Sequence, residues 1–152
     1  MRLLATPFEL PHGIGHGATI GEYNSEQCRD MIRKFHLELL SGLMHKLAKV
    51  PEGDGTMLDN TVIVYISDNS DKHHSFANEW PLLLFGGKFN GRLKSTGRYL
   101  QYPDYGKQGH RTIGNFLTTI VQAAGLPDKH FGHLDLGLSD LDQEGPLREL
   151  LL

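Results

Sequence analysis

Apolar residues recur at intervals of three and four between residues 24 and 50, which predicts one long amphipathic helix. The apolar face comprises Ile32, Phe35, Leu39, Leu43, Leu47 and Val50. Asn24 and Gln27 have the spacing of a capping box, and the Pro- and Gly-containing run 51–55 ends the helix. We expect this face, from Phe35 to Leu47, to pack against a sheet.

Two uninterrupted apolar runs predict buried strands. The first covers residues 61–67 and the second covers 81–85, and neither contains a charged residue. β-Branched and aromatic side chains without polar alternation are typical of strands covered on both faces of a parallel sheet. We therefore expect the two strands to be interior and parallel to each other, with a further short strand at about 98–101.

A second amphipathic helix is predicted from about Thr112 to Ala124. Its apolar side comprises Ile113, Phe116, Leu117, Ile120, Val121 and Ala124. Gly125 and Pro127 follow, as is typical beyond the end of a helix. Residues 128–152 show only a weak pattern, which predicts a tail with one short helix.

The order helix, strand, strand, helix predicts the α/β class, with a partial parallel sheet flanked by helices. Two or three strands are few for a free-standing sheet. We therefore expect residues 1–152 to form a single domain that is the carboxyl-terminal fragment of a longer protein. The missing amino-terminal half of the fold would be its partner.

Composition narrows the classes of partner. A net charge of −3 at pH 7 gives no indication of a nucleic-acid partner, and no apolar run approaches the roughly 20 residues of a membrane span. Nine histidines are more than usual, and they are clustered. This favours metal binding or proton chemistry, although histidine also serves as an ordinary polar residue.

Two histidine motifs are candidates for metal or anion chemistry. His12 and His16 lie among three glycines, which argue against a helix but let a loop fold closely around an ion. The alternative is a flexible loop with exposed histidines. His110 stands just before the second predicted helix, where a helix amino terminus can stabilise an anion, and the alternative is a capping-region histidine. Arg111 beside it is a candidate for oxyanion binding or a surface charge.

A third cluster follows the strand predicted at 61–67. It comprises Asp68, Asp71, His73 and His74. Ligands bind beyond the carboxyl ends of strands in open α/β sheets, and carboxylates mixed with imidazoles suit Zn, Mn or Fe. Adjacent histidines point apart, so at most one of the two is expected to be a ligand. The alternative is a solvated polar loop.

Taken together, the three clusters resemble the carboxyl-terminal half of the alkaline phosphatase and sulfatase superfamily. The spaced pair His12 and His16, the Asp68 loop after a strand and the late His110 followed by Thr112 carry this likeness. A closer resemblance is to the bacterial domain-of-unknown-function 1552 family, abundant in planctomycetes. The runs 51–60 and 81–87, Ser70-Asp71 and His74 carry it.

The resemblance implies a metal-dependent hydrolase of phosphate or sulfate esters, exported or periplasmic, that binds a divalent ion, with zinc as the candidate. The implied metal ligands are His12, His16, Asp68, Asp71, His74 and His110. We expect His12, His16 and His110 to approach one another, with Asp68 or Asp71 bordering the same space.

Two departures leave an alternative open. Asn69 stands where the superfamily has a metal-binding histidine, and the nucleophilic Ser or Thr of the superfamily lies upstream of the matching region. The chain would then hold a metal half-site without its nucleophile. The alternative is a degenerate, non-catalytic surface or ligand-binding domain, and the plainest interpretation is an α/β domain whose histidines have no special role.

Overall fold

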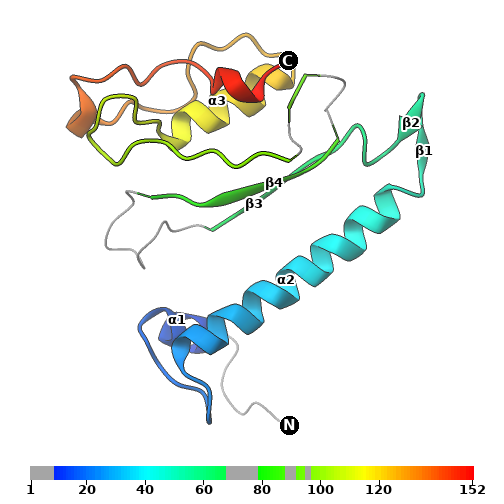
Figure 1. The fold of residues 1–152 in the computed structure, drawn as a ribbon, viewed down its shortest axis with the longest axis vertical. Coiled ribbons are helices and arrows are strands. Elements are labelled where there is room, and N and C mark those ends of the chain that lie inside the picture. Colours follow the sequence, from blue (N-terminus) through cyan, green and yellow to red (C-terminus); the bar gives the residue numbers. More distant parts are fainter. Residues whose placement is uncertain (1–8, 68–78, 88–91, 95–96) are drawn as a thin grey trace. The chain divides into compact units, whose positions relative to one another are not determined.

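The computed structural model describes residues 9–67, 79–87, 92–94 and 97–152, and the chain forms two compact units (Figure 1). The first unit ends at Lys46 and the second runs from Leu47 to Leu152. Within the described ranges, no helix is both long enough and apolar enough to cross a membrane.

The first unit begins with a short helix, α1 (Glu9–Gly15), where we expected a loop. Ile14 is buried, and the helix closes through hydrogen bonds from Gly17 N to Ile14 O (3.0 Å) and from Ala18 N to Gly13 O (2.8 Å). Gly17 has a φ of 89°, so the end is a Schellman motif. Glycine within a helix costs about 1 kcal/mol relative to Ala, and the buried isoleucine and the glycine-closed end offset that cost.

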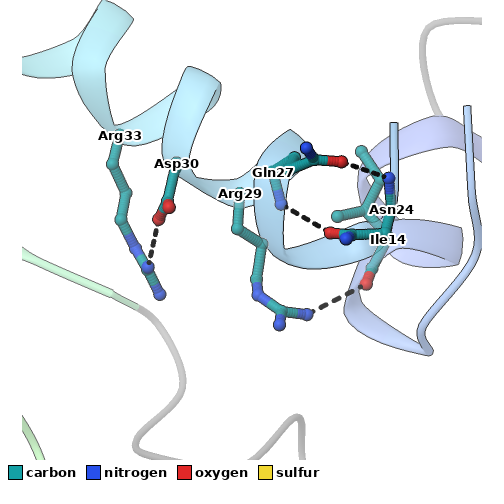
Figure 2. Close-up of polar contacts among 6 residues, drawn as sticks. All are labelled: Ile14, Asn24, Gln27, Arg29, Asp30 and Arg33. Carbon is teal, nitrogen blue, oxygen red and sulfur yellow. Dashed lines mark hydrogen bonds and ion pairs between the residues drawn. The ribbon is translucent and has the colours of Figure 1, made fainter. Parts of the chain in front are cut away.

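The long helix α2 (Ser25–Leu47) follows, and its predicted capping box is confirmed. Gln27 N donates to Asn24 Oδ1 (2.9 Å) and Asn24 N donates to Gln27 Oε1 (3.0 Å), as Figure 2 shows. Arg29 Nη1 donates to the carbonyl of Ile14 (3.4 Å), which joins α2 to α1 within this unit.

Within the first unit, the apolar face of α2 is largely uncovered, and its packing against the sheet stays a prediction because the sheet belongs to the second unit. Phe35, Leu39 and Leu43 have exposed fractions of 57%, 58% and 44%, and Cys28 is the buried residue of the helix. Hydrophobic periodicity identifies which face of a helix is apolar. It does not identify what covers that face.

In the second unit, the strands β3 (Val62–Ile66) and β4 (Leu82–Gly86) pair antiparallel, with Val64 opposite Leu84. The α/β class is confirmed in its general sense, but the parallel sheet is wrong. An apolar run indicates burial and not strand direction. The sequence from 67 to 81 has no helical periodicity that would predict a parallel crossover. A small antiparallel hairpin, β1 (Pro51–Glu52) and β2 (Gly55–Thr56), precedes them.

One face of the β3–β4 sheet contributes to the core of this unit, and the helix α3 (Ile113–Ala123) packs there. The core gathers Phe116, Leu147 and Leu150, with Val64, Leu82, Leu84, Tyr102, Ile113, Leu117 and Ile120 packed around them. Leu83 lies on the other face and is 45% exposed, so this face has only partial cover within the second unit. Figure 1 shows α3 beside the two strands.

The second predicted helix is confirmed as α3, and its ends follow the sequence signals. Thr112 caps it in a capping box with Asn115. Gly125, at a φ of 94°, closes the helix, with Leu126 N bonded to Val121 O (3.2 Å). The short strand expected at about 98–101 is absent, since that segment has no regular secondary structure.

The tail is a structural part of the core. It contains two short 3₁₀ helices, Leu136–Leu138 and Arg148–Leu150. Its last residues run beside the segment 92–94, with Lys94 N bonded to Leu150 O (2.8 Å) and Leu152 N bonded to Arg92 O (3.1 Å). The weak pattern of residues 128–152 therefore conceals residues that the fold requires.

Candidate functional site

His110 stands at the end of a tight turn that leads into α3. His110 N donates to Lys107 O (2.9 Å), and Lys107 N donates to Asp104 O (3.0 Å). Gly109 has a φ of 86°, a conformation that glycine adopts without strain. Two residues later Thr112 caps α3, so both the turn and the helix cap fix the backbone next to His110.

The imidazole of His110 is oriented by a backbone carbonyl. Its Nδ1 lies 2.9 Å from Pro103 O. Because a carbonyl can only accept, Nδ1 carries the proton, and Nε2 holds the lone pair in the neutral ring. Metal-ligating histidines commonly donate their other ring N–H to a carbonyl or carboxylate in this way.

Tyr105 lies against the same imidazole. The two ring centroids are 5.6 Å apart, and the ring planes meet at 71°. The Tyr105 hydroxyl donates to Asp135 Oδ2 (2.8 Å). This hydrogen bond, removal from water and the negative charge of Asp135 raise the pKa of the Tyr105 phenol above its usual value.

Buried amides hold Asp135 in place. Gln143, which is 6% exposed, accepts from Asp135 N (2.7 Å) and donates to Asp135 O (2.9 Å). Asn115, which is fully buried, donates to the carbonyls of Gln143 and Gly145, each at 2.8 Å. The contacts therefore run from Asn115 in the first turn of α3 through Gln143 and then Asp135 to Tyr105, which lies against His110.

A second polar group lies beside the core. The Tyr102 hydroxyl donates to Glu149 in a short hydrogen bond. Burial, the hydrogen bond to Glu149 and its charge raise the pKa of Tyr102 well above the usual range. Burial alone would raise the pKa of Glu149, but the bond from Tyr102, a backbone hydrogen bond and the Arg111 charge together lower it.

At the start of α3, where an anion site was predicted, the hydrogen-bond donors already bond to other groups of the chain. Asn115 Oδ1 accepts from Thr112 N (2.8 Å), and Asn115 N donates to Thr112 Oγ1 (3.4 Å). Arg111 Nη1 donates to Asp142 O (3.3 Å). These donors serve the fold, so the interpretation of Arg111 as an oxyanion ligand gains no support.

His12 and His16 lie on one side of the end of α1. Their ring centroids are 4.6 Å apart with the planes at 70°, and His16 N donates to His12 O (3.2 Å). The four-residue spacing therefore places both side chains on one side of a helical turn. The sequence had predicted a loop here, because of its glycines. His12 and His16 belong to the first unit and His110 to the second, so their convergence stays a prediction.

The remaining predicted ligands, Asp68, Asp71 and His74, lie outside the described residues, as does Asn69. Among the residues that the structure describes, no group of three or more His, Cys, Asp or Glu side chains could hold a metal ion.

The run 51–60, which carried the closer family resemblance, has a structural role here. Asp59 Oδ2 accepts from Thr56 N (2.8 Å) and Thr56 Oγ1 (2.7 Å) and so braces the β1–β2 hairpin. These two hydrogen bonds, side-chain first, lower the pKa of Asp59. Gly87 lies so close that an added Cβ would be 2.1 Å from Asp59 O.

Sequence reasoning missed Tyr105, Asp135 and Gln143. Asp135 and Gly137 have the spacing of a side-chain turn, since Asp135 Oδ1 accepts from Gly137 N (2.8 Å). That spacing is a local signal that we did not use, and it indicates a turn and not the contact with Tyr105, 30 residues earlier. Nothing local marked Tyr105 or Gln143.

The chain was compared with protein-family models, with curated proteins and with solved structures, and none of these comparisons found a match.

Proposed function

We propose that this chain is part of a metal-dependent hydrolase of phosphate or sulfate esters, of the alkaline phosphatase and sulfatase type. His110 would bind a divalent ion through Nε2. The observation that carries this proposal is the 2.9 Å contact between His110 Nδ1 and Pro103 O, which leaves the Nε2 lone pair for a metal.

The donor chemistry supports zinc as the ion. Neutral imidazole nitrogen is a common zinc ligand. The convergence of His12 and His16 on the same ion remains a prediction from the sequence. A bound divalent ion would supply charge stabilisation and lower the pKa of the attacking group. The role of His110 and its neighbours would be to hold the ligand nitrogen in a fixed orientation.

Zinc binding by single-histidine variants tests the proposal. We expect His110→Ala to weaken zinc binding, measured by isothermal titration calorimetry, relative to the unmodified chain. His45→Ala is the matched control, because His45 Nδ1 also lies against a backbone carbonyl, that of Ser41 (2.8 Å), but on exposed α2. Equal zinc affinity in all three proteins would overturn the assignment of His110.

In the superfamily that the chain resembles, the nucleophile lies upstream of the matching region, so we propose to test activity on the full-length protein with nitrophenyl phosphate and nitrophenyl sulfate. Turnover that zinc chelation abolishes supports the hydrolase. Zinc binding without turnover of either ester supports the alternative, a non-catalytic ligand-binding domain, which Asn69 in the sequence favours.

A further inference from the structure

We infer that Tyr105 and Asp135 are positioning residues that hold the His110 imidazole with Nδ1 on the Pro103 carbonyl and Nε2 directed away from it. This inference rests on the proposed role of His110. It goes further because it assigns the orientation of the ligand to two residues that no sequence signal indicated.

The first support is the geometry of the three side chains. The hydrogen bond to Pro103 fixes one edge of the His110 ring (2.9 Å). A single hydrogen bond leaves the ring able to rotate about it, and the Tyr105 ring, edge to face at 5.6 Å, limits that rotation. The hydrogen bond and the ring contact together restrict the orientation of the imidazole plane.

The second support is the way Tyr105 is held. An exposed aromatic ring changes rotamer readily, and Tyr105 is 40% exposed. Its hydroxyl is anchored on Asp135 Oδ2 at 2.8 Å. Asp135 also accepts from Gly137 N through its other oxygen, so the carboxylate is fixed at both oxygens.

The third support is that the anchor is tied to the helix that His110 precedes. Gln143 bonds both backbone groups of Asp135, and Asn115, in the first turn of α3, bonds the Gln143 carbonyl. The buried Asn115 therefore links Thr112, two residues after His110, to the segment that holds Asp135. Such outer contacts orient metal-binding histidines and tune their basicity.

The test uses Tyr105→Phe, which keeps the ring and removes only the hydroxyl. We expect this variant to bind zinc alone about 10-fold more weakly, the lower end of the effect for outer contacts of a ligand. Its His110 side-chain ¹⁵N NMR signals should show a smaller population of the Nδ1–H tautomer without metal. Tyr99→Phe is the control, because the Tyr99 ring is 86% exposed and its hydroxyl makes only a 3.4 Å contact.

Two changes at Asp135 separate positioning from general stability. Asp135→Ala removes both acceptors and should reproduce the Tyr105→Phe result. Asp135→Asn retains one acceptor for Gly137 N and can donate to the Tyr105 hydroxyl, so it should restore zinc affinity and the tautomer population. Thermal melts on all variants identify a change that is only structural.

The inference is overturned if Tyr105→Phe leaves both zinc affinity and tautomer population at the Tyr99→Phe values, or if it lowers only the melting temperature. Failure of the proposed function looks different, because His110→Ala would then leave zinc affinity unchanged. In that case the positioning role of Tyr105 and Asp135 is tested only by the Nδ1–H tautomer population of His110 in the metal-free variants.

Discussion

At the scale of single residues, two phenols are held in their protonated state. The pKa of Tyr102 and that of Tyr105 are raised from 10.0, so the stability from these hydroxyls is present below about pH 10 and lost as the pH rises through the raised values. We expect an alkaline titration followed by tyrosinate absorbance to show that the Tyr102 and Tyr105 phenols ionise at a higher pH than a free phenol.

Single substitutions assign that titration. Tyr102→Phe and Tyr105→Phe should each remove one late-ionising phenol, whereas Tyr99→Phe should leave both in place. A titration in which neither of the first two variants loses its late component would contradict the hydrogen-bond partners described for these hydroxyls.

Substitution by alanine should change the free energy of unfolding in opposite directions at two glycines, Gly87 and Gly42. At Gly87 an added Cβ would lie 2.1 Å from Asp59 O and 2.3 Å from Asp59 Cα, which only a backbone shift can relieve. We expect Gly87→Ala to lower the free energy of unfolding by roughly 1–3 kcal/mol or more, as overpacking does.

Gly42 is the matched control, since it lies inside α2 with open space at its Cβ position. Gly42→Ala should stabilise α2 by roughly 0.5–1 kcal/mol. Urea denaturation of both variants measures the two effects, and a loss of stability at Gly42 equal to that at Gly87 would contradict the packing described.

At the scale of elements, α3 holds the tail through its polar side. Asn115 Nδ2 bonds the carbonyls of Gln143 and Gly145, and Thr119 Oγ1 accepts from Leu147 N (2.7 Å). Asn115→Ala leaves buried backbone groups without partners, so we expect a loss of roughly 1–3 kcal/mol in the free energy of unfolding.

Gln122→Ala on the same helix provides the comparison. Its amide also bonds a tail carbonyl, that of Asp128 (2.8 Å), but where water can replace the lost partner. A loss of about 1 kcal/mol or less is expected in thermal melts. Equal losses at the two positions would show that burial of Asn115 is not decisive.

The sequence was most informative where one element determines its own structure. The cap at Asn24, the apolar period from 112 to 124 and the glycine end at Gly125 are local signals, and they predicted α2 and α3. Strand direction was mispredicted because it depends on how two separate segments meet, and residues 62–66 carry no information about direction.

For the candidate site too, local features were predicted from the sequence and contacts between distant residues were not. The placement of His110 before a helix was predicted, because Thr112 and the apolar period beyond it are visible in the sequence. The contacts that orient its ring were not, because Pro103 acts through its carbonyl and Asp135 is 25 residues away. Backbone acceptors have no sequence signature.

At the scale of the whole molecule, the second unit depends on residues far along the chain. Leu150 is 8% exposed and belongs to the core with Phe116, whereas Leu152 is 65% exposed. We expect Leu150→Ala to cost roughly 2–5 kcal/mol and Leu152→Ala to stay within about 0.5 kcal/mol.

Amide hydrogen exchange of the Leu150→Ala variant identifies the elements that lose stability. Amides of α3 and of β3–β4 should lose protection in Leu150→Ala, because they share its core. Amides of α1 and the first turns of α2 belong to the other compact unit and should keep theirs. Equal loss throughout the chain would show one cooperative unit in place of two.

The core position of Leu147 and Leu150 has a consequence during synthesis. The strands β3 and β4 leave the ribosome long before the residues that complete their core, and until then their apolar face has no cover from the tail. Domains generally fold as units, and a nascent strand pair in this condition is open to aggregation. Ribosome-bound chains stopped before residue 147 should therefore recruit chaperones that bind apolar segments, and chains extended past residue 152 should release them.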